Sequence, residues 1–407
     1  MNAAPTSLTA LQDRAAHYTA LRRDIHQHPE IGFEEFRTSA LVAQRLQDWG
    51  YTVTRGLGGT GVVGQLTRGT GARRLGLRAD MDALPIVEAT GLPYASCHTG
   101  LRHACGHDGH TAMLLAAAEH LAAHGQFDGT LNLIFQPAEE SLGGARKMME
   151  EGLFERFPCD AIFAMHNMPG FRQGQLLLRE GATMASSENI LVHIEGTGGH
   201  GAMPHLGADP VVAGASIVLG LQTIVSRNVA PLQMAVITVG AFQAGVANNV
   251  IPQNATLKLS VRALDRGVRE LLRRRIVELV EAQAQSYGVR ARVEFLPGYP
   301  VLVNTPAETA LAREVALDLV GADNVVLQTE PLTGSEDFAY MLEAVPGSYL
   351  FIGNGDAANG GHGACMVHNP NYDFEDRNIP IGAAFWVQLT ERFLAPCVHD
   401  HATYKAP

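Results

Sequence analysis

Short apolar runs alternate with helical patterns along the first part of the chain, and this alternation constrains the fold more than any other feature. Helices are predicted over residues 8–23, 34–49 and 109–123, and buried strands over residues 61–66, 75–78, 131–135 and 161–165. Strands that alternate with helices favour a largely parallel sheet with helices on both faces. The sequence therefore predicts an α/β domain here.

The pattern changes near Ser186. The residues beyond it predict the order strand, helix, strand, strand, helix, strand, at 190–195, 209–226, 234–243, 255–263, 267–286 and 290–296. This βαββαβ order forms a ferredoxin-like two-layer domain by itself. A linker at 297–300 (PGYP) then returns the chain to elements of the first kind, predicted as helix 306–320, strands 325–328 and 348–352, and a helix from about 379.

A chain of 407 residues is too long for one ordinary core, so two domains are expected. We predict a larger α/β domain made from residues 1–187 and 299–407. Residues 188–298 are predicted to form a smaller domain inserted between these two parts.

Bulk properties exclude some classes of partner. A net charge of −11 argues against nucleic acid or an anionic membrane as the main partner. The first residues lack a basic start followed by an apolar core, and no apolar stretch approaches the length of a bilayer, so neither a signal peptide nor a membrane span is expected. Five cysteines without a CxxC pair do not indicate a disulfide framework, and a cytoplasmic location is expected.

Acids and imidazoles follow three of the predicted strands directly. Asp80 and Asp82 follow the strand at 75–78, Glu139 and Glu140 follow that at 131–135, and His166 follows that at 161–165. In an open parallel sheet, ligands bind outside the carboxyl ends of the strands. We therefore expect these side chains to gather at one crevice.

The residue types in this crevice are those that bind divalent metals. Cys105 and His107 also stand just before the predicted helix 109–123, and imidazole, thiolate and carboxylate are the usual ligands of zinc and related ions. A thiolate or carboxylate can bridge two metals, whereas a neutral imidazole cannot. Of Glu139 and Glu140, one can ligate while the other acts as general base, and the spacing leaves open which does which.

Each of these signals has an ordinary structural interpretation when taken alone, because Cys-Gly-His, paired glutamates and a lone histidine all occur without metals. Their combination at one sheet end favours a metal site. Asp82 is expected to orient a ligand, and the role of Asp80 stays open. His26 and His28 are interpreted as structural residues. His110, three residues past His107 on the same helix face, is interpreted as a packing residue, with a role in supporting the ligands as the alternative.

At this point the motifs resemble a known family. The segments RADMDALPI, HACGHDGHTAMLL, FQPAEE, MHNMPG, GGHGAMPH, NVIP, GSEDF and VHNPNYDF occur in order over nearly the whole chain. Together they resemble the dinuclear metallo-aminoacylase and carboxypeptidase family, and within it the branch of hippurate hydrolases and auxin-amino-acid-conjugate hydrolases.

The resemblance implies a role for individual residues. The matching metal ligands are Cys105, His107, Glu140, His166 and His368, with Cys105 as the bridging candidate. Glu139 matches the catalytic base, and Asp82 matches the acid that orients a ligand. The broader family has histidine where this chain has Asp80, and commonly a carboxylate where it has Cys105, which leaves the preferred metal open. His368 follows a Gly-rich loop and depends mainly on the resemblance.

The resemblance also implies that the inserted domain is a lid and dimerisation domain. His200 matches a histidine that stabilises the oxyanion, often in the active site of the partner subunit, while the role of His205 stays open. Asn249 and Arg262 match residues that hold the carboxylate of the substrate, which suits a guanidinium chemically.

The resemblance implies hydrolysis of the amide bond of N-acyl-amino acids, releasing a carboxylic acid and an amino acid. It implies two divalent ions per subunit, zinc first, with manganese, cobalt or nickel as alternatives, and a homodimer or homotetramer formed through the inserted domain. The same two-metal chemistry would serve a dipeptidase, a carboxypeptidase or an N-acetyl-diaminopimelate deacetylase. A non-catalytic metal-binding protein is a further alternative.

One rival interpretation comes from a different enzyme class. Residues 59–64 match G-x-G-x-x-G, with Asp80 and Asp82 about twenty residues further on, as in a dinucleotide-binding oxidoreductase. That fingerprint requires a helix directly after the glycines. The following residues, QLTRGTGARR, have no helical period, and this argues against a nucleotide site.

Overall fold

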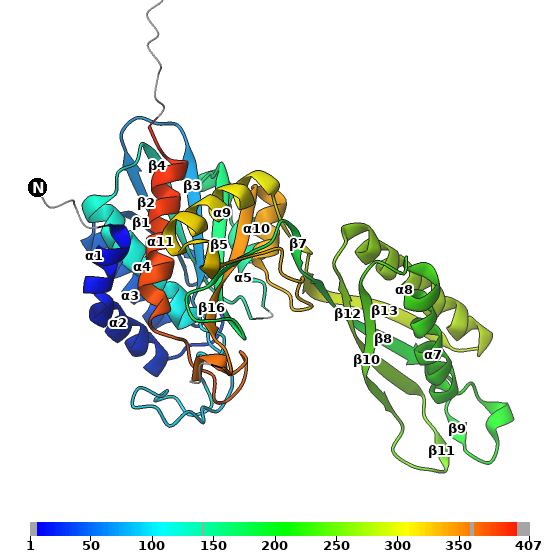
Figure 1. Cartoon of the computed structure of the whole chain (residues 1–407). Coiled ribbons are helices and arrows are strands. Elements are labelled where there is room, and N and C mark those ends of the chain that lie inside the picture. The colour runs from blue at the N-terminus through cyan, green and yellow to red at the C-terminus, as the bar shows by residue number, and fades with distance from the viewer. Residues whose placement is uncertain (1–5, 141, 359–361, 397–407) are drawn as a thin grey trace, which may run out of the picture. The chain divides into compact units, whose positions relative to one another are not determined.

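The computed structural model describes residues 6–140, 142–358 and 362–396. Its contacts divide the chain into two units (Figure 1). Unit 1 comprises residues 1–181, 304–329 and 341–407, and unit 2 comprises residues 182–303 and 330–340.

Unit 1 is built on an eight-stranded mixed sheet. In spatial order its strands are β1 (Thr52–Leu57), β2 (Gly61–Arg68), β4 (Gly129–Gln136), β3 (Arg74–Asp80), β5 (Ala161–Pro169), β16 (Gly347–Gly355), β6 (Leu176–Leu178) and β15 (Val325–Leu327). The central neighbours β4, β3, β5 and β16 are parallel, whereas β1, β2 and β4 pair antiparallel. The prediction of a mainly parallel α/β sheet is confirmed, with antiparallel pairing among β1, β2 and β4 at one edge and between β16 and β6.

Helices cover this sheet because its central strands are apolar on both faces. Nearly every residue of β3, β4, β5 and β16 is buried. Helices α3, α4, α9 and α11 pack against the sheet, and α5 packs against β4. The helices of unit 1 are α1 (Ser7–Asp13), α2 (Ala15–Gln27), α3 (Phe36–Asp48), α4 (His107–His124), α5 (Gly144–Glu150), α6 (Leu153–Arg156), α9 (Pro306–Val320), η2 (Ala322–Asn324), η3 (His362–Ala364) and α11 (Asn378–Phe393).

Unit 2 contains the predicted βαββαβ order of elements. Its four-stranded antiparallel sheet has the order β10 (Ala235–Ala244), β12 (Asn254–Ala263), β8 (Ser186–Glu195) and β13 (Arg290–Tyr299), with helices α7 (Pro210–Asn228) and α8 (Arg266–Ser286). Alternate residues of β12 are buried, as expected for a sheet with one covered face. Shorter elements are β9 (Gly199–His200), η1 (Pro204–Leu206) and β11 (Val250–Ile251). β7 (Gly181–Met184) pairs with β14 (Leu302–Asn304), and α10 spans Phe338–Ala344.

Helix α7 corrects one expectation. By length and composition alone it could cross a membrane, although the sequence was expected to hold no such stretch. Its side chains Ala213, Ile217, Leu221 and Ile224 are buried in the core that it shares with the sheet of unit 2. That packing is typical of the core helix of a two-layer domain.

Other differences from the predicted elements are local. The helix predicted over residues 8–23 is two helices that meet at Arg14. A short helix that was not predicted, α10, begins at Phe338, the last residue of the GSEDF segment. The glycines at 59–64 lead into strand β2 and not into a helix, so the structural requirement for a dinucleotide fingerprint is not met.

Candidate metal centre

The carboxyl ends of three adjacent strands meet where the sequence predicts a crevice. Asp80 ends β3 and pairs with Gln136, which ends β4, while β5 runs parallel to β3 on its other side and carries His166. The loop after β4 carries Glu139 and Glu140. The sheet topology therefore delivers residues far apart in sequence to one edge.

Six predicted residues come together at this edge. In each of three overlapping groups, one ligand-type atom per residue lies within 4.8 Å of the others: Cys105 with His107 and His166, Cys105 with Glu140 and His368, and His107 with Glu139 and Glu140. The shared members Cys105, His107 and Glu140 link these groups. The structure thus brings together every residue that the sequence placed at the metal site or as its base.

The tight turn that delivers His107 requires glycine. Gly106 precedes α4 with φ of 94°, in the left-handed region. A Cβ atom here would lie 1.9 Å from Oδ1 of Asn167 and 2.6 Å from the hydroxyl of Tyr372. The first residue of the helix is therefore held close to strand β5.

His107 is oriented by Asp82. Its Nδ1 lies 3.1 Å from Oδ1 of Asp82, so Nδ1–H donates to this carboxylate and Nε2 is the nitrogen left for a metal. Nε2 is buried without a hydrogen-bond partner. Burial lowers the pKa of His107, but the charges of Asp80 and Asp82 outweigh it and raise the pKa to about 10. The ring therefore holds a proton that a cation could replace.

His166 presents the same nitrogen. Its Nδ1 lies 2.6 Å from the carbonyl oxygen of Asn167, to which it donates, and its Nε2 lies 3.3 Å from Sγ of Cys105. Burial, with the nearby ring of His110, holds the pKa of His166 well below its ordinary value. The ring is therefore neutral at neutral pH, as a metal ligand must be.

Cys105, Glu140 and His368 complete the cluster. Nε2 of His368 lies 3.1 Å from Oε1 of Glu140, and this interaction raises the pKa of His368. His368 itself has φ of 66°, and its backbone N–H donates to the carbonyl of Ala104 over 2.7 Å. Burial, with the charges of Glu140 and Glu139, raises the pKa of the Cys105 thiol well above its ordinary value.

The donor set fits a pair of divalent cations. Thiolate, imidazole and carboxylate converge, and the buried Nε2 of His107 forms no hydrogen bond, with Oδ2 of Asp80 3.8 Å away. The acidic groups hold protons on His107 and Cys105 that binding of cations would release. The exposed fraction of the His107 side chain is only 1%, so a cation bound at the cluster would give this nitrogen a partner that bulk solvent does not.

Polar side chains behind the cluster take the alternative role that the sequence left open for them. His110, interpreted as a packing residue, has Nδ1 2.6 Å from Oδ1 of Asp80 and Nε2 2.8 Å from Oδ1 of Asn167. Asp80 also accepts a hydrogen bond of 2.7 Å from Arg78. Asp80 is thus held between a guanidinium and an imidazole, and the three-residue spacing of His107 and His110 was the signal for this network.

The remaining predicted residues lie in unit 2. His200 pairs with Val250 across β9 and β11, and the backbone N–H of Ala202 donates to its Nδ1 over 3.0 Å, which leaves Nε2 as a donor. The carbonyl of Asn249 accepts from the N–H of Gly201, so Asn249 and His200 are neighbours.

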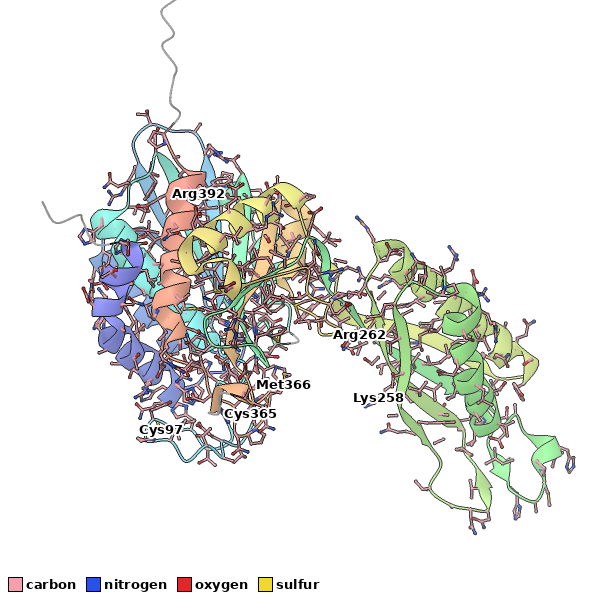
Figure 2. The ribbon with its side chains drawn as sticks, viewed as in Figure 1. Cys97, Lys258, Arg262, Cys365, Met366 and Arg392 are labelled. Carbon is pink, nitrogen blue, oxygen red and sulfur yellow. The ribbon has the colours of Figure 1, made fainter. Side chains whose placement is uncertain are left out.

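Arg262 lies on another part of unit 2, on the central strand β12 (Figure 2). It stands opposite Ser187 of β8 and Val236 of β10. Its side chain is partly buried, which lowers its pKa, and among the described residues no carboxylate forms an ion pair with it. His205 lies exposed in η1.

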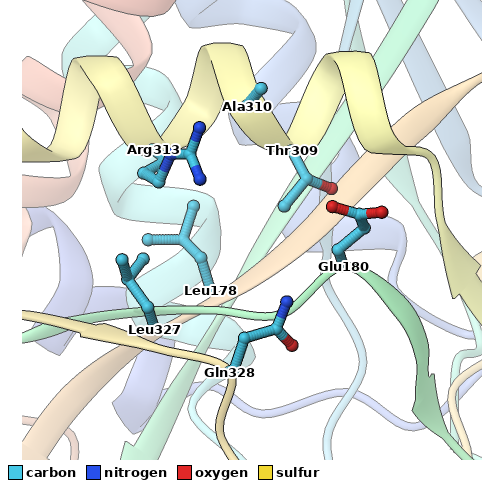
Figure 3. A pocket seen from close by; sticks show the side chains of 7 residues that line it. All are labelled: Leu178, Glu180, Thr309, Ala310, Arg313, Leu327 and Gln328. Carbon is cyan, nitrogen blue, oxygen red and sulfur yellow. The ribbon is translucent and has the colours of Figure 1, made fainter.

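A small pocket lies elsewhere in unit 1, between α9 and the ends of β6 and β15 (Figure 3). Its lining residues are Leu178, Glu180, Thr309, Ala310, Arg313, Leu327 and Gln328. It contains one carboxylate and neither imidazole nor thiol, so its residue types do not suit a transition metal.

Comparison with known proteins identifies the class. The sequence matches the peptidase family M20/M25/M40 over residues 76–392, and the chain belongs to this family. It is a hydrolase of the hippurate hydrolase and aminoacylase type.

Relatives that match over almost the whole chain support this assignment to the family. The chain is 43% identical to hippurate hydrolase of Campylobacter jejuni, covering 94% of this chain and 98% of that protein. It is 40% identical to an IAA-amino acid hydrolase of Arabidopsis thaliana, covering 95% and 89%. A solved dinuclear metal-binding peptidase of the M20 family from Bacillus subtilis is 31% identical, with a TM-score of 0.81 over 94% of this chain and 99% of that one.

Proposed function

We propose that this protein hydrolyses the amide bond of N-acyl-amino acids with two divalent ions bound per subunit. The convergence of Cys105, His107, Glu140, His166 and His368, with the buried Nε2 of His107 left without a hydrogen bond, carries this proposal. Relatives named for hippurate, N-acetyl-L-cysteine and IAA-amino acids support the class of substrate. The products would be a carboxylic acid and an amino acid.

Glu139 is the general base in this proposal. It is 7% exposed, and one of its carboxylate oxygens lies within 4.8 Å of ligand atoms of Glu140 and His107, so it could reach a water molecule held by bound ions. The bound ions would supply Lewis-acid activation of the water and of the substrate carbonyl. Glu139 accepts the proton of the attacking water and passes it to the departing amine.

The side chains of unit 2 would contact the substrate. His200 keeps its Nε2–H free to donate because its Nδ1 accepts from Ala202, and such a donor can stabilise an oxyanion. Arg262 has no carboxylate partner among the described residues of the protein, so its guanidinium is available for the carboxylate of the substrate. Asn249 is assigned to the same carboxylate.

We propose zinc as the first candidate metal, because the set contains one thiolate and three imidazoles. Manganese, cobalt and nickel remain alternatives, since ligand types fix the identity of a metal poorly.

A homodimer formed through unit 2 is part of the proposal, with a homotetramer as its alternative. Strand β10 is an edge strand of the four-stranded sheet. Val236 and Phe242 on this strand, and Val212 and Leu219 on α7, are large exposed hydrophobic residues. An unpaired edge with exposed apolar side chains is the kind of surface that a second subunit covers.

Substitution of Arg262 tests the class of substrate. Arg262→Ala should lower kcat/KM for N-benzoylglycine by about 10- to 100-fold, the loss of one charge-assisted contact, and leave the slower hydrolysis of its amide unchanged. Arg290→Ala serves as the matched control, because Arg290 lies on the same sheet and pairs with Glu195 at the surface. Equal losses on acid and amide would refute the assignment of Arg262.

A further inference from the structure

Glu35 is a buried acid outside the proposed ligand set. It precedes α3, and its side chain is fully buried. Oε1 accepts a hydrogen bond of 2.8 Å from the backbone N–H of Ala138, and Oε2 accepts one from the hydroxyl of Thr60. One carboxylate thus joins the start of α3, the start of β2 and the loop after β4.

The backbone that Glu35 binds has an unusual conformation. Ala138 has φ of 54°, in the left-handed region that a residue with a Cβ atom adopts only at a steric cost. It stands directly before Glu139, the proposed base, and Glu140, a proposed ligand. A conformation of this kind persists only where the surrounding structure holds it.

The structure holds Ala138 on both sides of its Cα. Its N–H donates to Glu35, and its carbonyl accepts from Gly144 over 3.0 Å. Neighbouring glycines allow the close approach, since a Cβ atom on Gly32 would lie 2.9 Å from Cα of Ala138. Because Ala138 is fully buried, its N–H would have no partner if the carboxylate were removed.

We propose that Glu35 is a positioning residue for catalysis, which fixes the left-handed turn at Ala138 and thereby aims Glu139 at the reacting water. This role deepens the proposed function and depends on it for its effect on turnover. Glu35 contacts the peptide adjoining the base, so a small rotation about Ala138 would displace the Glu139 carboxylate. Misplacement of a catalytic group by about 1 Å can cost 100-fold in rate.

Three variants separate positioning from simple core stability. Glu35→Met removes both acceptor oxygens, while Glu35→Gln keeps an acceptor for the N–H of Ala138. Thr60→Val is the matched control, because it removes the other partner of the same carboxylate and leaves the bond to Ala138. Each variant is assayed metal-replete for kcat, KM, bound metal and thermal unfolding.

The expected result is a selective loss in kcat. Glu35→Met should lower kcat about 10- to 100-fold with KM and saturating metal content unchanged, and Glu35→Gln should restore most of it. Thr60→Val should keep near-normal kcat even where it lowers the melting temperature. Equal losses of kcat in Glu35→Met and Thr60→Val, or a normal kcat in Glu35→Met, would overturn the proposal.

Hydrogen exchange tests the turn independently of activity. Peptides covering residues 134–140 should exchange faster in Glu35→Met than in the wild type, and at the wild-type rate in Thr60→Val. Unchanged protection in Glu35→Met would overturn the positioning role even if the protein hydrolyses N-acyl-amino acids. Faster exchange in Glu35→Met, together with a wild type that hydrolyses none of these substrates, would instead refute the proposed function alone.

Discussion

Asp82 binds His107 and the backbone of Glu140 with one carboxylate. Oδ1 lies 3.1 Å from Nδ1 of His107, and Oδ2 accepts a hydrogen bond of 2.9 Å from the N–H of Glu140. The two proposed ligands come from α4 and from the loop after β4. A single acid therefore sets the spacing between two segments that contribute to the cluster.

Removal of this acid should weaken metal binding more than it weakens the fold. Asp82→Ala is expected to lower metal affinity about 10- to 100-fold, because His107 loses the partner that fixes its tautomer and ring orientation. Competition with a chelator measures this affinity directly. Much of the activity should return at high metal concentration, and unchanged affinity would exclude the orienting role.

The Cys105 thiol should make metal binding depend on pH. Its raised pKa, and the pKa of about 10 at His107, mean that metals displace protons from both side chains. Affinity should therefore rise with pH, by about tenfold per pH unit for each proton displaced. Titration of the protein with zinc at pH 6 and pH 8 measures the change, and equal affinities would contradict it.

The same cysteine offers a comparison of substitutions. Cys105→Ala should lose affinity for metal, whereas Cys105→Asp should retain more of it, because a carboxylate can also bridge two ions. Metal content after dialysis ranks the two variants. Equal loss in both would argue against a bridging role for residue 105.

Mixed dimers can show in which subunit His200 acts. His200→Ala alone should lower kcat about 100- to 1000-fold, as expected for loss of an oxyanion donor. When it is mixed with Glu139→Ala after dissociation and reassociation, about a quarter of wild-type activity should return if His200 serves the site of the partner subunit. No recovery in verified mixed dimers would place His200 in its own subunit's site.

Glu35 should make stability depend on pH. Burial raises the pKa of Glu35 to about 7, and hydrogen bonding from Thr60 opposes the rise. The folded-state pKa of Glu35 lies above its unfolded value. The contribution of Glu35 to the free energy of unfolding is therefore fully present below the unfolded pKa and is lost as pH rises through about 7. The loss is roughly 3 kcal/mol at 1.36 kcal/mol per pKa unit.

Comparison with Glu35→Gln isolates this term, since glutamine cannot ionise. Between pH 5 and pH 9, the free energy of unfolding of the wild type should fall relative to that of Glu35→Gln. Urea unfolding of the metal-free proteins at both pH values measures it. A difference independent of pH would show that Glu35 titrates normally.

Much of the site was predictable because strand ends are visible in the sequence. Asp80, Glu139 and His166 each follow or end an apolar run, and parallel neighbours bring such ends together. The two-layer order of unit 2 followed from its periodicity for the same reason. His368 could be placed only through resemblance, because it follows a loop whose course has no periodic signal.

The supporting residues were not predictable, because their roles depend on tertiary contacts. Glu35 lies 103 residues from Ala138 in sequence, and nothing local indicates that its carboxylate meets that amide. The link between His110 and Asp80 likewise forms only after α4 packs on β3. By length and composition, α7 is apolar enough to cross a membrane, although its buried face packs in the core of unit 2.

Hydrolysis of N-acyl-amino acids by metal-loaded and chelated protein tests the central claim most directly. The panel should include N-benzoyl, N-acetyl and indole-3-acetyl amino acids together with dipeptides, assayed on wild type and Glu139→Ala. We predict turnover of N-acyl-amino acids by the metal-loaded wild type, loss of turnover on chelation with recovery on addition of metal, and at least about 100-fold lower kcat in Glu139→Ala with metal still bound. Turnover that survives chelation, or near-normal rates in Glu139→Ala, would contradict the account.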